Sequence, residues 1–255
     1  MKSRKRHAKP DRPVASESGL PNPAWKRGLD LAALTIFLPI LAPVWLMIAG
    51  WIRLTSPGSI FFRQQRIGRG VQPFTFYKFR SMKVNVDTGV HQSHLEELIQ
   101  SDTPMVKLDV LGDPRLIPGG RFLRASGLDE LPQILNVLQG RMSLVGPRPC
   151  TTSELSLYRK NQKKRFRVLP GLTGYWQVQG KNKTTFTEMI ALDDYYVEHM
   201  SLWLDLKILV RTPAVLIAQM FEILLKGARR EGKKQECMVC CDGSGTQSLK
   251  QGRSL

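Results

Sequence analysis

The longest apolar stretch of the chain covers residues 31–52 and contains no charged side chain. At ~1.5 Å rise per residue, a helix of this length reaches across a hydrocarbon core of ~30 Å. Pro39 and Pro43 lie in its middle, and an interior proline removes a helix hydrogen bond and kinks the helix. The pattern predicts a membrane helix at 24–53 that turns near Ala42 and Pro43.

Lysine and arginine are abundant on both sides of this stretch, and no Asp or Glu occurs between Leu31 and Val86. Cationic residues beside a membrane segment favour the cytoplasmic side. Two cytoplasmic ends would make the segment re-entrant, so that it enters the membrane, turns and leaves on the same side. A straight single-pass anchor is the alternative, because prolines also occur in spanning helices. The flanks and the prolines alone leave both open.

The rest of the chain alternates short apolar runs with turn residues, which predicts an α+β fold that is predominantly helical. Aromatic-rich runs at 60–66 and 73–79 are separated by a Gly-Arg-Gly segment and predict a small β-hairpin. A short helix is expected at 134–138, with Pro132 tolerated in its first turn and Gly140 closing it.

Three further helices are expected. Thr151-x-x-Glu154 has the spacing of a capping box and predicts a helix that runs through Arg165. Another is expected at 184–199. The last is amphipathic, covers 213–226 and can be capped by the preceding threonine. Its apolar face could rest on a membrane surface or pack against the body of the protein.

The chain is strongly basic, with 38 Lys and Arg against 21 Asp and Glu, a net charge of +17. This balance indicates an anionic partner. Because the basic residues crowd beside the apolar stretch, we expect the lipids of a membrane, where each cation contributes ~1 kcal/mol. Zinc-finger spacing, leucine-zipper heptads and an RNA-recognition aromatic motif are missing from the sequence, so nucleic acid is not expected.

The clearest candidate for chemistry is the acidic pair Asp129 and Glu130, which stands among arginines at the expected start of a helix. Such surroundings favour negative charge, as a nucleophilic or metal-binding carboxylate requires. A helix-capping Asp followed by a surface Glu is the alternative.

Two basic motifs are candidates for binding phosphate. Arg148 is held between Pro147 and Pro149, which fix the backbone and could present a planar guanidinium to a phosphate. Lys78 and Arg80 flank an aromatic residue at the end of the second hairpin strand. A solvated loop and an edge strand are the respective alternatives.

Several motifs occur in a fixed order: LDLAALTIFLPILAPVW, SPGSIFFRQQRIG, FYKFRSM, LDELPQILNVLQGRMSLVGPRP, LPGLTGYWQVQG and SLWLDLKIL. Between about residue 25 and residue 218 the chain resembles the bacterial sugar transferase family. These are monotopic polyprenol-phosphate phosphoglycosyl transferases that start exopolysaccharide, O-antigen and glycoconjugate synthesis. The chain resembles the short form of the family, which lacks the additional spanning helices of longer members.

The resemblance implies a re-entrant membrane helix bent at a Ser-Pro pair. Ala42 and Pro43 hold that position, so the serine is replaced. It also implies that Asp129 attacks the sugar-bearing phosphorus of a nucleotide-diphosphate sugar, usually a UDP-sugar. UMP leaves, and a polyprenol phosphate, commonly undecaprenyl phosphate, then takes the phosphosugar from the aspartyl intermediate. Mg²⁺ is implied near Asp129 and Glu130.

The motif positions implied to contact phosphate are Lys78, Arg80, Arg124 and Arg148. The resemblance places the protein on the cytoplasmic face of the bacterial inner membrane, with downstream glycosyltransferases as further partners. A non-catalytic membrane-anchored scaffold that binds anionic lipid or nucleic acid is the competing hypothesis.

The expected organisation has four parts. Disordered tails are expected at 1–23 and 227–255, on either side of the membrane helix and of a cytoplasmic catalytic domain at 54–226 with amphipathic interfacial helices.

Overall fold

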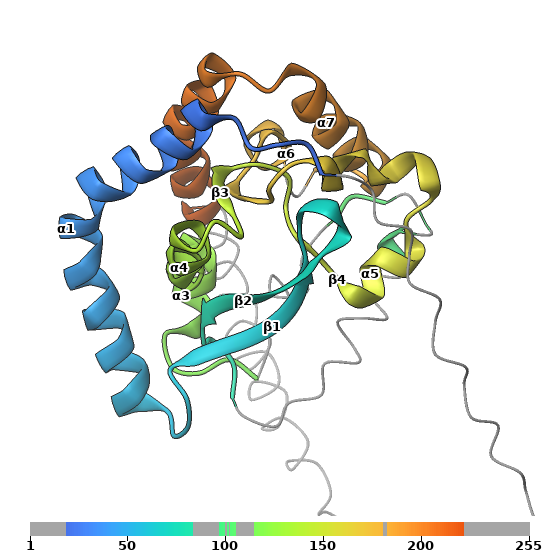
Figure 1. Ribbon diagram of the computed structural model, residues 1–255. Helices are drawn as coiled ribbons and strands as arrows, with labels where there is room; N and C mark the ends of the chain where they lie inside the picture. Colours follow the sequence, from blue (N-terminus) through green and yellow to red (C-terminus); the bar gives the residue numbers. More distant parts are fainter. Residues whose placement is uncertain are drawn as a thin grey trace, which may run out of the picture.

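A computed structural model describes residues 19–83, 97–99, 101, 103–105, 115–180 and 183–221. The expected tails lie outside the described residues except for residues 19–23, and they stay predictions. Figure 1 shows a long helix, α1, beside a mainly helical body with a small sheet.

The apolar stretch forms a single helix, α1 (Ala24–Thr55), with Pro39 and Pro43 inside it. Figure 1 shows that α1 bends about midway, as interior prolines make a helix do. By length and composition, α1 is the one helix among the described residues that is long and apolar enough to cross a membrane.

The two ends of α1 contribute fully buried side chains to the core, whereas its middle contributes only partly buried ones such as Leu41 and Trp45. Leu34 near the start and Ile48, Ala49 and Ile52 near the end are buried. Between them most of the large apolar side chains are exposed. The most exposed are Ile36, Ile40, Leu46 and Met47.

The predicted hairpin is confirmed. Strands β1 (Phe61–Ile67) and β2 (Pro73–Phe79) pair antiparallel, with Gln64 opposite Phe76. A third strand, β4 (Cys150–Thr151), pairs with the far end of β1, which leaves β2 at the edge of the sheet. A separate parallel pair joins β3 (Ser143–Val145) to β5 (Gly171–Thr173).

Further helices connect these strands and complete the body (Figure 1). They are η1 (Arg69–Val71), α3 (Gly120–Ser126), η3 (Leu128–Gln133), α4 (Ile134–Leu138), α5 (Thr152–Leu157), η4 (Lys160–Arg167), α6 (Tyr175–Gln179), α7 (Phe186–His199) and a helix at 202–221. The helix predicted at 134–138 is confirmed as α4, and that predicted at 184–199 is confirmed as α7, which begins two residues later.

The prediction of one helix from Thr151 through Arg165 is wrong. Thr151 does cap α5, because its hydroxyl accepts a hydrogen bond from the Glu154 N–H. The helix ends at Leu157, and Tyr158 is extended. Its ring is buried against two aromatic rings, those of Phe166 and Phe186. This packing breaks the helix, and η4 follows as a separate element.

The prediction that Thr212 caps a new helix is also wrong. One helix runs through 202–221, and the Thr212 hydroxyl donates to the Ile208 carbonyl within it. Ile208 is completely buried in the core between α1, β2 and α7. The Thr212 hydroxyl thus bonds back into the preceding turn, whereas an N-cap side chain accepts from an N–H of the turn that follows it. Residues 222–226 of the predicted helix lie outside the described residues.

Candidate active site

Asp129 and Glu130 lie in the first turn of η3, immediately after a left-handed turn. Gly127 ends α3 and begins η3 with φ 73° and ψ 6°, a conformation that glycine adopts without the penalty of a Cβ atom. The turn brings η3 against strand β2. Asp129 is 6% exposed there.

Asn136, on α4, fixes this part of the chain against β2. Its Nδ2 donates to the Thr75 carbonyl at 2.7 Å, and its Oδ1 accepts from the Tyr77 N–H at 3.2 Å. Because β2 is an edge strand, these backbone groups lack a neighbouring strand, and the buried amide takes its place. These hydrogen bonds connect α4 to β2, and η3, which carries the acidic pair, directly precedes α4.

Lys78, on β2, meets both carboxylates. Its Nζ donates to Glu130 Oε1 at 2.7 Å and lies 3.7 Å from Asp129 Oδ2. Opposite charges at these separations attract strongly in a partly buried site. The structure therefore brings together three of the residues that the sequence predicts.

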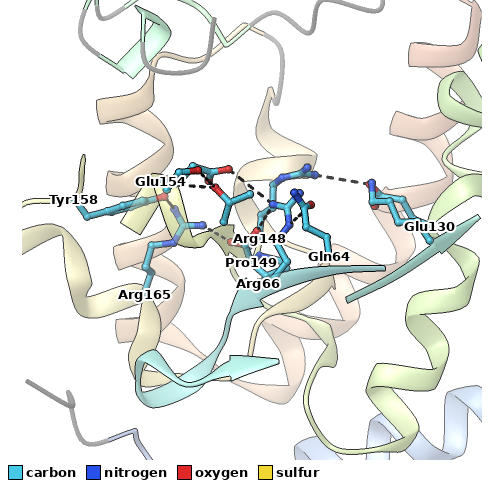
Figure 2. Close-up of polar contacts among 11 residues, drawn as sticks. Gln64, Arg66, Glu130, Arg148, Pro149, Glu154, Tyr158 and Arg165 are labelled. Atoms are coloured by element: carbon cyan, nitrogen blue, oxygen red, sulfur yellow. Dashed lines mark hydrogen bonds and ion pairs between the residues drawn. The ribbon is translucent and has the colours of Figure 1, made fainter. Parts of the chain in front are cut away.

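Arg148 approaches the same carboxylate from the loop that follows β3. Its Nη1 lies 3.8 Å from Glu130 Oε1. Figure 2 marks this ion pair with a dashed line. The loop is packed closely at its start, because a Cβ atom on Gly146 would lie 2.4 Å from the Leu169 carbonyl oxygen. Pro147 accepts a hydrogen bond from the Gly171 N–H at 2.9 Å.

The remaining two predicted cations have different surroundings. Arg124 lines the same cavity as Asp129 and Glu130, and its Nη1 is 3.5 Å from Ser81 Oγ. Arg80 is buried, and its guanidinium donates to the carbonyls of Ser56 and Pro57, directly after α1. Arg80 thus holds the end of α1, and its contact with phosphate stays a prediction.

A cavity of about 750 Å³ lies between the first half of α1, the α3–η3 segment and helix 202–221. Its wall is mostly aliphatic, with Leu41, Leu172 and Leu209 among the side chains that line it. Asp129 and Glu130 belong to the same wall. An amphiphile with an apolar chain and an anionic head matches this combination of surfaces.

The acidic pair is also suited to a divalent cation. Within the described residues, no cluster of three or more Asp, Glu, His or Cys side chains is placed to hold a metal ion. Mg²⁺, however, is commonly held by one or two carboxylates together with substrate phosphates. The two adjacent carboxylates fit that mode, and Mg²⁺ stays a prediction.

Two buried arginines near Arg148 were not predicted from the sequence as site residues. Arg66 donates to the Pro149 carbonyl at 3.0 Å, and Arg165 donates to the Arg148 carbonyl at 2.6 Å. Nothing in the sequence distinguishes them from neighbouring basic residues, because each lies in a run of polar or charged side chains.

Comparison with known proteins gives one consistent result. A family model described as bacterial sugar transferase matches residues 21–219. The exopolysaccharide production protein ExoY of Sinorhizobium fredii is 36% identical over 223 residues, which are 86% of this chain and 99% of that protein.

Two relatives have names that state a reaction. The UDP-glucose:undecaprenyl-phosphate glucose-1-phosphate transferase of Caulobacter vibrioides is 42% identical over 200 residues, 75% of this chain and 69% of that protein. The undecaprenyl-phosphate galactose phosphotransferase of Salmonella typhimurium is 39% identical over 199 residues, 75% of this chain and 40% of that protein.

Proposed function

This chain belongs to the bacterial sugar transferase family and is a phosphoglycosyl transferase, and we propose that it transfers a sugar 1-phosphate from a UDP-sugar to undecaprenyl phosphate. UMP is the second product, and the lipid-linked sugar starts the assembly of a polysaccharide. The names of the Caulobacter and Salmonella relatives support these two substrates.

The observation that carries the proposal is the cavity that joins a membrane helix to the acidic pair. Its apolar wall comes partly from α1, which is apolar enough to enter a membrane. A polyprenol chain can lie against this wall while its phosphate approaches Asp129 and the neighbouring Arg124. A scaffold needs no such connection between an apolar cavity and a pair of carboxylates.

The chemistry proposed for Asp129 is two successive displacements at one phosphorus atom. In the first, an Asp129 oxygen forms a bond to the sugar-bearing phosphorus, the diphosphate P–O bond breaks, and UMP leaves with its electron pair. In the second, a phosphate oxygen of the polyprenol phosphate attacks the same phosphorus. The Asp129–phosphorus bond breaks, and the carboxylate is restored.

The cations around Asp129 and Glu130 have roles that follow from their positions. Lys78 contacts both carboxylates and can offset the charge of the diphosphate as it approaches. Arg148, 3.8 Å from Glu130, presents a planar guanidinium suited to phosphate oxygens. Mg²⁺ held by Asp129 and Glu130 would add Lewis-acid stabilisation of the same charge.

For the membrane helix we propose the re-entrant arrangement. A straight helix of this length would separate its ends by ~48 Å, yet both ends contact the same body. Lys26 near the start forms an ion pair with Asp205, and Trp51 near the end donates to the Pro118 carbonyl at 3.3 Å. The exposed apolar middle would then lie in one leaflet, with both basic flanks on the cytoplasmic side.

The topology is tested by labelling single cysteines placed near residues 20 and 60 in sealed vesicles with a membrane-impermeant thiol reagent. Both should react from the same side. Reaction from opposite sides would restore the straight anchor and refute re-entry.

The reaction is tested by measuring UMP release in nanodiscs that contain undecaprenyl phosphate and Mg²⁺. UDP-glucose and UDP-galactose are the first donors to try, since relatives are named for both sugars. Asp129→Asn should abolish release, while Glu198→Gln, at an exposed position on α7, should leave it unchanged.

The intermediate is tested without acceptor lipid. Incubation with the accepted UDP-sugar should raise the intact mass of the protein by one sugar phosphate, with the added mass on the peptide that contains Asp129. Undiminished turnover by Asp129→Asn, or an unchanged mass, would refute the aspartyl intermediate.

A further inference from the structure

The loop that carries Arg148 is held from both sides by buried arginines. Figure 2 shows a continuous series of polar contacts from Tyr158 and Arg165, through Arg148 and Pro149, to Glu130. The prolines fix the loop backbone, but they cannot donate hydrogen bonds from their own nitrogens. The loop carbonyls are therefore the groups through which neighbouring donors can hold it.

Arg165 holds the loop on one side. Its Nη2 donates to the Arg148 carbonyl at 2.6 Å and lies 2.9 Å from Asp193 Oδ2. Its Nη1 donates to the Tyr158 hydroxyl at 2.6 Å. The Arg165 and Asp193 side chains are each 2% exposed. A planar guanidinium can serve three partners in fixed directions, which an ammonium cannot do.

Arg66 holds the loop on the other side. Its Nη1 donates to the Pro149 carbonyl at 3.0 Å, and its Nε donates to Gln64 Oε1 at 3.0 Å. Its guanidinium also lies over the Phe76 ring, 5.2 Å from the centroid. The Lys78 ammonium is 5.5 Å from the centroid of the same ring. Arg66 is therefore tied both to the Arg148 loop and to the strand that carries Lys78.

This arrangement is costly for stability. Burial, together with the nearby Arg148 charge, lowers the pKa of Arg66. Glu154, 3.9 Å from Arg66 Nη1, offsets part of the cost, as Asp193 does for Arg165. Two buried, hydrogen-bonded cations beside a third are expensive where stability alone is at stake, and such groups concentrate at functional sites.

We propose that Arg66 and Arg165 are positioning residues that act through Arg148. By donating hydrogen bonds to the carbonyls of Pro149 and Arg148, they keep the Arg148 guanidinium beside Glu130, where it can bind the substrate phosphate. The inference rests on the proposed function, because Arg148 is taken to contact the donor. Neither arginine needs to touch the substrate itself.

The test is a double-mutant cycle on UMP release. Arg66→Lys and Arg165→Lys keep the positive charge but cannot serve all the partners of the guanidinium. Each should lower kcat/KM for the UDP-sugar by roughly tenfold or more, as expected when a charged hydrogen bond that orients a binding group is lost. In an Arg148→Ala background the same substitutions should cause no further loss beyond about twofold.

Matched controls lie close by in the chain. Arg63→Lys on β1 and Arg167→Lys on η4 change exposed arginines and should leave kcat/KM unchanged. Losses that multiply in the Arg148→Ala background would show that Arg66 and Arg165 act independently of Arg148, and would overturn the proposal.

Cys150, which follows Pro149 directly, gives a readout that does not depend on turnover. With Cys237, Cys240 and Cys241 replaced by serine, it is the one thiol left in the chain. At a temperature well below the Tm of every variant, iodoacetamide should modify it faster in Arg66→Lys and Arg165→Lys than in the wild type, because the loop opens locally. An unchanged rate would overturn the proposal. If the wild type releases no UMP from any UDP-sugar, the proposed function fails, and the labelling rate alone decides about the loop.

Discussion

Lys26, in the first turn of α1, connects this long apolar helix to the body through a buried ion pair. Its ammonium contacts Asp205, on helix 202–221, and donates to the Tyr196 hydroxyl at 2.8 Å. The Tyr196 hydroxyl in turn donates to Asp205 Oδ1 at 2.7 Å. Lys26 and Asp205 are each 1% exposed. Lys26→Met keeps the apolar stem of the side chain and removes its charge.

The expected cost follows from what remains buried. Removing one partner of a buried pair leaves the other charge uncompensated and typically costs about 3–5 kcal/mol. For a protein of this size that corresponds to a Tm lower by about 6–20 °C. In Lys26→Met/Asp205→Leu both charges are gone, and Tyr196 can still donate to the Val145 carbonyl at 3.2 Å. The double variant should therefore be more stable than the single one.

The pKa of Asp205 sets the sign of the pH dependence. Burial raises the pKa of Asp205, and Lys26 opposes the rise, so its removal should raise this pKa further. A carboxyl whose pKa is higher in the folded state binds a proton more readily when folded than when unfolded. Stability is then lost as pH rises from the ordinary carboxyl pKa through the raised folded value. The Tm deficit of Lys26→Met should shrink as the pH is lowered from 7.

The assay is thermal unfolding in one detergent or nanodisc, with UMP release measured on the same samples. Lys207→Met, which changes an exposed lysine on helix 202–221, is the control and should leave Tm nearly unchanged. A Lys26→Met protein as stable as the wild type, or a double variant less stable than the single one, would show that the buried ion pair does not support the fold in this way.

Three further predictions concern the site and its support. Asn136→Asp keeps the acceptor for the Tyr77 N–H but removes the donor to the Thr75 carbonyl, and should cost about 1–3 kcal/mol in denaturant unfolding; an unchanged midpoint would contradict the role given to this amide. Burial raises the pKa of the Cys150 thiol to about 12, so iodoacetamide at pH 8 should modify it only after unfolding, and reaction at the rate of a free peptide thiol would contradict its burial. EDTA should abolish UMP release and added Mg²⁺ should restore it, whereas turnover that persists in EDTA would remove the proposed metal role of the acidic pair.

Features that depend on neighbouring residues could be predicted from the sequence. The uncharged stretch with two prolines became the bent helix α1, and the aromatic runs around a Gly-Arg-Gly segment became the β1–β2 hairpin. The sequence also identified three candidate site residues, because their side-chain types and immediate neighbours indicate the chemistry. They are Asp129, Glu130 and the proline-flanked Arg148.

Features that depend on contacts between distant segments could not be predicted in this way. Strands as short as Cys150–Thr151 have no periodic pattern and exist because β1 pairs with them. The chain leaves helical conformation at Tyr158, where the rings of Phe166 and Phe186 bury its side chain.

The same reason explains the site. The cavity is lined by α1 and by helix 202–221, which lies well over a hundred residues later in the chain. The two arginines that donate hydrogen bonds to the Arg148 loop come from β1 and η4. Local sequence limits which backbone shapes a segment can adopt and which chemistry it carries. Burial and hydrogen-bond partners from elsewhere in the chain decide which of those shapes persists and which charged groups meet.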